Sequence, residues 1–111
     1  MTEVIVRPLA EADLDEGAGW YLPVAPNKVG DFLNDFDNIL STIEKFPRLW
    51  PKTEGIIRRA PFVHFPYSAW YVYLKDVDEN NADVANIIAV TNDLRDSAEN
   101  AHRVKQANQS R

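Results

Sequence analysis

The stretch Arg58-Arg-Ala-Pro-Phe-Val-His-Phe-Pro-Tyr-Ser-Ala-Trp-Tyr-Val-Tyr73 decides the fold that we expect for this chain. It holds half of the phenylalanine, tyrosine and tryptophan residues of the sequence. Aromatic and β-branched residues favour the pleated, half-buried surface of a sheet. The two prolines cannot donate to a strand ladder and therefore interrupt it. We predict a strand over residues 56–65 with a bulge or an edge at Pro61, a turn at Phe65-Pro66-Tyr67, and a second strand over residues 68–75.

The residues before this stretch predict a short strand and a first helix. Residues 3–7 alternate polar and β-branched side chains, which is typical of a strand. Pro8 suits the first position of a helix, because its missing N–H has no helical partner there. Apolar or small residues then recur at helical spacing and are expected to face the core, at Leu9, Ala12, Leu14, Gly17, Ala18 and Tyr21. The acidic residues are expected on or near the other side, at Glu11, Asp13, Asp15 and Glu16.

A second helix has the clearest periodic pattern in the sequence. Asn27 is expected to be its N-cap. Pro47 and Pro51 bound it, since the residue before a proline is disfavoured in the helical conformation. Its apolar positions step by three and by one, at Val29, Phe32, Leu33, Phe36, Ile39, Leu40, Ile43 and Phe46. The two predicted helices therefore form a hairpin.

The residues after the aromatic stretch complete the sheet. The acidic residues 76–83 are expected to form a solvated hairpin loop, which lacks the glycine and terminal glutamate of an EF-hand calcium site. Residues 84–91 are largely apolar and are expected inside the sheet. A short helix is expected from Ser97 to about Gln106, followed by a frayed tail that ends at residue 111. The predicted fold is α+β, with the order β-α-α-β-β-β-(α) and a helical hairpin packed on one face of a mainly antiparallel sheet.

The composition limits the classes to which the protein can belong. With 111 residues, 45% of them hydrophobic, the chain can bury one core, and we expect a single domain over residues 1–111. It has no cysteine, which excludes disulfides, thiolate metal sites and cysteine nucleophiles. It shows neither a basic leader nor the run of about 20 apolar residues that crosses a bilayer. We therefore expect a cytoplasmic protein with no membrane partner, no metal and no cofactor.

The charge distribution is uneven. A net charge of −5 argues against binding to nucleic acid by bulk electrostatics, which depends on Lys and Arg neutralising phosphates. We expect no direct sequence-specific binding to nucleic acid. Basic residues nevertheless lie close together, with only Glu54 against them, at Lys45, Arg48, Lys52, Arg58 and Arg59. This pattern fits either a local basic face or a charge-mixed, solvated surface.

Short motifs along most of the chain carry a family resemblance. They are, in order, residues 10–16 followed by Trp20-Tyr21, Phe32-Leu33, residues 43–47, Arg58-Arg59, Phe65-Pro66-Tyr67 running into Tyr71, residues 88–90, and Leu94-Arg95-Asp96. In this order and spacing the chain resembles the ParE branch of the RelE/ParE toxin superfamily over roughly residues 3–96. The resemblance implies the same α+β fold and a type II toxin–antitoxin module.

Within that superfamily the resemblance leaves three functions open. ParE-like toxins inhibit DNA gyrase and are neutralised by a cognate antitoxin, often a small ParD-like DNA-binding protein, in a hetero-oligomer. RelE-like relatives are ribosome-dependent mRNA endoribonucleases. A third type of relative has lost toxicity and retains only antitoxin binding. The fold alone does not choose among them, since one scaffold carries unrelated sites.

The residue types favour target binding over catalysis. Cleaving RNA through its 2′-hydroxyl needs groups that exchange a proton and cations that stabilise the transition state. The candidates for such chemistry are Arg58, Arg59, His64 and Arg95, a small set for a ribonuclease. For binding the target we predict Arg58, Arg59, Tyr67, Asn92 and Arg95. Asn92 stands where many ParE-like relatives show a histidine, and this difference favours a relative without toxicity.

A separate group of aromatic residues is predicted to contact the antitoxin, at Trp50, Tyr71 and Tyr73. Trp50 lies between prolines, where a large aromatic residue either anchors a partner or covers the open end of the helical hairpin. Tyr71 and Tyr73 alternate with Trp70 and Val72, so one set is expected in the core and the other in a groove. The antitoxin is expected to supply an amphipathic segment that orders on binding.

Overall fold

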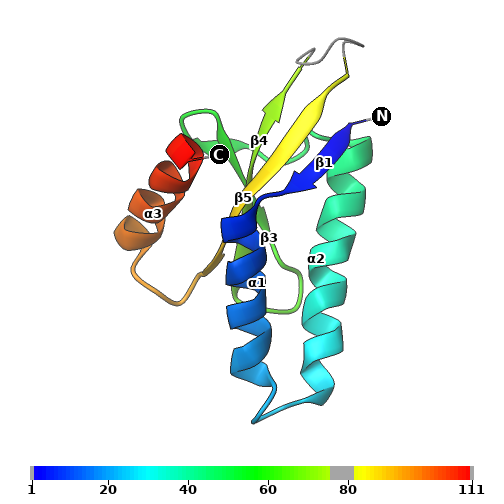
Figure 1. The fold of residues 1–111 in the computed structure, drawn as a ribbon, viewed down its shortest axis with the longest axis vertical. Helices are drawn as coiled ribbons and strands as arrows, with labels where there is room; N and C mark the ends of the chain where they lie inside the picture. The colour runs from blue at the N-terminus through cyan, green and yellow to red at the C-terminus, as the bar shows by residue number, and fades with distance from the viewer. Residues whose placement is uncertain (1, 76–81, 111) are drawn as a thin grey trace.

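A five-stranded β-sheet organises the computed structural model, which describes residues 2–75 and 82–110 (Figure 1). The strands lie in the order β1-β5-β4-β3-β2. β1 pairs with β5 in parallel, and the other neighbours pair antiparallel. The predicted α+β fold is therefore confirmed. The elements are β1 Glu3–Val6, α1 Pro8–Tyr21, α2 Asn27–Lys45, β2 Lys52–Glu54, β3 Ile57–Pro61, β4 Tyr67–Leu74, β5 Val84–Asn92 and α3 Ser97–Ser110.

Helices cover both faces of the sheet. The α1–α2 hairpin packs on one face, where buried side chains of α2 meet Tyr71 and Ile87. On the other face, Val104 and Ala107 of α3 pack against Trp70. Tyr71 and Trp70 are both buried, so the prediction that one of the two alternating sets on this strand lines an open groove was wrong. The segment is apolar on both faces because helices cover both sides of the sheet at this central strand.

The predicted helices form, but three details differ. α2 starts at Asn27 itself after an N-cap at Pro26, and no side chain caps it, so the predicted Asn27 cap was wrong. In α1, Leu9 is 52% exposed and Asp13 is buried, the reverse of the expected faces. α3 continues to Ser110 rather than ending near residue 106, because Ala107 is buried against the sheet. No helix in the described part of the chain is long and apolar enough to cross a membrane.

The strands also differ in their limits. β3 ends at Pro61, which pairs with Ser68 at the end of the ladder, so the strand stops four residues before the predicted end. The turn before β4 contains Phe65 and Pro66, while Tyr67 is already the first residue of β4. β2 was not predicted, because its three residues are polar and show no apolar alternation. The predicted acidic loop falls largely on residues 76–81, which lie outside the described residues.

Over the second half of β5, no strand among the described residues pairs with the edge that β1 occupies over the first half. β1 pairs with β5 only as far as Ile87, because α1 begins directly after it. On the β4 side, the register shifts between Trp70 and Tyr71, which leaves Ile88 as an extra residue. Such a bulge changes the side of the sheet to which the following residues point. The N–H and C=O groups that face outward from Val90 onward therefore need partners from side chains.

Candidate functional site

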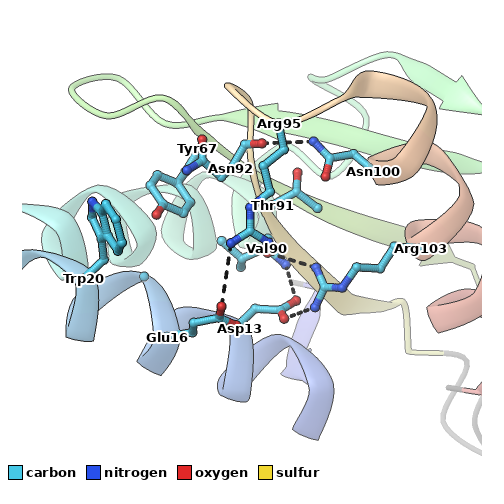
Figure 2. Close-up of a pocket in the computed structure, with 11 residues that line it drawn as sticks. Asp13, Glu16, Trp20, Tyr67, Val90, Thr91, Asn92, Arg95, Asn100 and Arg103 are labelled. Carbon is cyan, nitrogen blue, oxygen red and sulfur yellow. Dashed lines mark hydrogen bonds and ion pairs between the residues drawn. The ribbon is translucent and has the colours of Figure 1, made fainter.

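A cavity of about 260 Å³ lies along this free edge, between α1, α3 and the end of β5 (Figure 2). It is lined by Asp13, Glu16, Gly17, Trp20, Tyr67, Val90, Thr91, Asn92, Arg95, Asn100 and Arg103. We call it the β5-end pocket. Three residues predicted for target binding line it, namely Tyr67, Asn92 and Arg95. They come from two strands and the turn after β5.

The floor of the pocket is an ion pair between Asp13 and Arg103. This pair bonds the backbone groups of Val90 that a neighbouring strand would otherwise bond. The Asp13 carboxylate accepts the Val90 N–H at 2.9 Å and forms an ion pair with Arg103 of α3. Arg103 also donates to the Val90 carbonyl at 3.4 Å. Burial lowers the pKa of Arg103 from its ordinary value. Because one carboxylate and one guanidinium together satisfy both Val90 backbone groups, α1 and α3 are tied to the same residue of β5.

A fixed turn forms the end of the pocket. The Asn92 side chain accepts the Leu94 N–H at 2.9 Å, and Asn100 donates to the Asn92 carbonyl at 2.9 Å. Arg95, which follows this turn, reaches Glu16 of α1 at 3.7 Å. Both side chains of this pair are more than half exposed, so the pair contributes little to stability and leaves Arg95 free to meet a partner.

Two aromatic residues complete the walls. Tyr67 is buried, and its pKa is raised chiefly by burial and then by the neighbouring Tyr21, while Arg95 partly offsets the shift. Its hydroxyl therefore stays protonated at neutral pH. Trp20 stands at the rim with 71% of its surface exposed, and Figure 2 shows its ring beside the opening. The pocket offers an apolar ring, hydrogen-bonding groups and one weakly held cation.

The formal charges that line the pocket cancel. Asp13 and Glu16 carry two negative charges, and Arg95 and Arg103 carry two positive charges. A neutral pocket of this kind suits a polar or singly charged group of another molecule, such as a protein side chain. It does not concentrate positive charge as a phosphate-binding site does.

Arg59 lies on the α3 face of the sheet, in a small network of its own. Its guanidinium pairs with Asp93 at 3.1 Å, stands 5.8 Å from the centre of the Trp70 ring and donates to the Ser68 hydroxyl at 3.0 Å. Ser68 in turn donates to Asp93 at 2.9 Å. Arg59 is therefore a neutralised cation next to the end of β5.

Arg58 points to the opposite face, as alternation on a strand predicts. It donates to the Trp50 carbonyl at 2.7 Å, and Trp50 packs edge-on against Tyr71. Tyr71 is fully buried and donates its hydroxyl to the Pro47 carbonyl at 2.7 Å. Of the residues predicted for antitoxin contact, Trp50 and Tyr73 are half-buried, whereas Tyr71 has no exposed surface to offer.

His64 lies apart from the other predicted residues, in the turn before β4. Its backbone N–H and its Nδ1 contact the two carboxylate oxygens of Asp35 at 2.7 and 2.8 Å. Asp35 is buried on α2, while the His64 ring is 71% exposed. This contact joins the turn to the helical hairpin. Arg58, Arg59, His64 and Arg95 therefore do not form one cluster.

Five residues of the floor and rim of the pocket were not predicted as site residues, namely Asp13, Glu16, Trp20, Asn100 and Arg103. A signal for Asp13 was present, because Ala10, Asp13 and Gly17 share one helical face and are the buried residues of α1. A carboxylate on a buried face needs a partner, and that requirement points to a basic residue elsewhere. Among the residues that the structure describes, no three acidic or histidine side chains are grouped to hold a metal ion.

The helical hairpin on one face of a mainly antiparallel sheet is the α+β arrangement that the family resemblance implies. Among solved structures, the chain is similar to one in the structure described as the chromosomal ParDE TA system from P. aeruginosa, with a TM-score of 0.66 and 18% sequence identity. The similarity covers 83% of this chain and 96% of that chain. No family model and no curated protein matches the sequence. The resemblance seen in the sequence is thus confirmed at the level of the fold.

Proposed function

We propose that this chain is the toxin component of a type II toxin–antitoxin module and that it acts by binding DNA gyrase. The β5-end pocket carries the proposal, because it gathers Tyr67, Asn92 and Arg95 beside an exposed tryptophan. The ParE-like motifs in the sequence and the fold shared with a chain of a ParDE system support it. In this proposal the protein acts in the cytoplasm and binds gyrase through surface complementarity.

The geometry favours binding over RNA cleavage. A general base and its acid must both reach the reacting group, and cations must surround the same phosphate. Arg58 and Arg59 point to opposite faces of the sheet, and Arg59 is paired with Asp93. His64 is held by Asp35 on the helical hairpin. Because these groups are spread over separate places, the proposed activity is non-enzymatic.

The test is controlled expression of the chain in bacteria, followed by three measurements. We expect growth to stop, cells to form filaments and a DNA-damage reporter to be induced. Purified protein should also inhibit supercoiling by purified gyrase. Arrest with cleaved messages, intact DNA and unaffected gyrase would replace this proposal with the endoribonuclease. Unimpaired growth at high expression would instead favour a relative that has kept only antitoxin binding.

Neutralisation is the second half of the proposal. A cognate antitoxin is expected to bind the chain and restore growth, in a toxin–antitoxin hetero-oligomer. The partner to test is the product of the neighbouring reading frame, co-expressed with this chain. A stable complex together with restored growth supports the module, whereas a toxic chain that no neighbouring product binds contradicts it.

A further inference from the structure

A surface just after the C-terminal end of α2 combines exposed apolar side chains with positive charge. Phe46 and Leu49 belong to the short turn between α2 and β2, and they are 62% and 60% exposed. Exposed basic residues are close to them in the sequence, at Lys45, Arg48 and Lys52. We call these five residues the turn patch. Large apolar residues that are exposed next to one another mark interaction sites more often than scattered ones do.

The charge of the turn patch is opposite to that of the whole chain. The chain carries −5, yet this segment brings three cations together. Lys52 of β2 lies opposite Arg58 of β3 in the strand register. Residues opposite each other point to the same face of a sheet, so both side chains lie on the face that carries the turn. Of the acids near the patch, Glu54 is neutralised by Lys105 at 3.2 Å, and Asp83 accepts the hydroxyl of Tyr73, over whose ring Arg48 lies. Glu44 is exposed on α2, next to Lys45 in the sequence. The patch therefore favours an acidic partner.

The backbone beneath the patch is held in place before any partner binds. Arg58 donates to the Trp50 carbonyl at 2.7 Å, and Tyr71 donates to the Pro47 carbonyl at 2.7 Å. Leu49 N–H donates to the Phe46 carbonyl at 3.1 Å, which closes the turn between the two exposed residues. A surface that is already ordered loses less conformational entropy on binding.

The position of the patch also fits a chain that adds to the sheet. β2 is the last strand of the sheet, and its outer side pairs with no strand in the described residues. Lysine on an edge strand discourages pairing with apolar edges of other molecules. An acidic segment would instead be attracted by Lys52 while its apolar side chains cover Phe46 and Leu49.

We propose that the turn patch is the docking site for an acidic segment of the antitoxin that also carries apolar side chains. This inference rests on the proposed function, because it takes the partner to be the antitoxin. It assigns neutralisation to a surface separate from the β5-end pocket. Electrostatic attraction to the three cations speeds encounter, and burial of the two apolar side chains holds the complex together.

The experiment titrates the purified product of the neighbouring reading frame against the chain and two double variants. The variant Arg48→Glu/Lys52→Glu should weaken binding at least 10-fold at low salt, and the deficit should shrink as salt is raised, because salt screens exposed charges. The variant Phe46→Ser/Leu49→Ser should weaken binding at least 10-fold at all salt concentrations. All of the substituted side chains are exposed, so thermal unfolding should change little.

Matched controls use exposed residues at the other end of the helical hairpin. Lys28→Glu makes one such charge reversal, and Val24→Ser removes one exposed apolar side chain, where each turn-patch variant changes two residues. Both should bind as the wild type does. Wild-type affinity in the two turn-patch variants would overturn the inference and leave the toxin–antitoxin proposal standing. Absence of any binding by the unaltered chain would instead overturn both.

Discussion

Asp13 shows how a single buried carboxylate can stand in for a strand. β1 ends before it can pair with the second half of β5, and the Asp13 side chain accepts the Val90 N–H in its place. The same carboxylate pairs with Arg103, so one residue links α1, β5 and α3. A buried polar group costs free energy unless it is hydrogen-bonded, and here each oxygen has a partner.

Removing the Asp13 carboxylate should therefore lower the free energy of unfolding substantially, although the side chain is small. We expect Asp13→Ala to lower the free energy of unfolding by about 2–4 kcal/mol, because a buried N–H and a half-buried guanidinium both lose their partner. Asp13→Asn should lose about half as much, since the amide oxygen still accepts the Val90 N–H. Urea denaturation measures both, with exposed Asp15→Ala as the control. Equal, small losses in all three variants would contradict this role for Asp13.

Tyr71 is a buried tyrosine whose ionisation makes the stability of the fold depend on pH. Burial raises the pKa of Tyr71 above its ordinary value of 10.0. Above that pH the unfolded state binds fewer protons than the folded state, so the free energy of unfolding falls as pH rises. Tyr71→Phe should be about 0.5–1.5 kcal/mol less stable at pH 7, because the hydrogen bond to Pro47 is lost.

In the Tyr71→Phe variant, the free energy of unfolding should fall less steeply as pH rises than it does in the wild type. Tyr71→Phe removes a tyrosine with a raised pKa, and Tyr67, whose pKa is also raised, remains to give a smaller slope of the same sign. Thermal melts between pH 7 and pH 11 give both readouts in one series. Parallel curves for the wild type and the variant across this range would show that Tyr71 does not titrate as its burial implies.

At the scale of elements, the close approach of α1 to α2 depends on Gly17. A Cβ atom at this position would lie 2.7 Å from the Phe32 ring and 3.4 Å from Tyr67. Phe32 is fully buried and contacts four other aromatic rings, so it has little room to move. A Cβ atom at Gly19, two residues further along the same helix, would meet no described atom within 4 Å beyond its chain neighbours and the backbone of its own helix.

These two glycines should respond to alanine with opposite sign. Gly17→Ala should lower the free energy of unfolding by about 1–3 kcal/mol, because overpacking outweighs the gain in helix propensity. Gly19→Ala should raise it by about 0.5–1 kcal/mol, since only the propensity changes. Chemical denaturation of the two variants beside the wild type decides the matter. A stabilised Gly17→Ala would mean that the two helices can separate without loss.

The helices and long strands could be predicted from local patterns, but the pocket could not. The spacing of Phe32, Phe36, Ile39 and Ile43 identified α2, and these four side chains are buried as that spacing implies. β2 has no pattern of its own, because a three-residue polar edge strand is defined by its neighbour β3. Asp13 and Arg103 are 90 residues apart, and only the packing of α3 on β5 makes them partners.

In the whole molecule, the two proposed surfaces lie apart along the helical hairpin. The turn patch follows the C-terminal end of α2, and the rim of the β5-end pocket is formed by the C-terminal half of α1. The two helices run in opposite directions, and Figure 1 places these ends at the top and the bottom of the hairpin. An antitoxin docked on the patch therefore acts at a distance from Trp20 or continues along the hairpin to cover it.

Separation of the surfaces predicts variants that lose one property and keep the other. Trp20→Ala/Arg95→Glu should abolish growth arrest on expression while antitoxin affinity changes less than about 3-fold, because only the β5-end pocket is altered. Arg48→Glu/Lys52→Glu should still arrest growth but escape neutralisation by the co-expressed antitoxin. Lys28→Glu should keep both properties.

Plating efficiency with and without the antitoxin, together with affinities of the purified proteins, measures growth arrest and neutralisation in all of these variants. If each double variant lost both properties while staying folded, target and antitoxin would share one continuous surface, and the division of the molecule into two sites would be wrong.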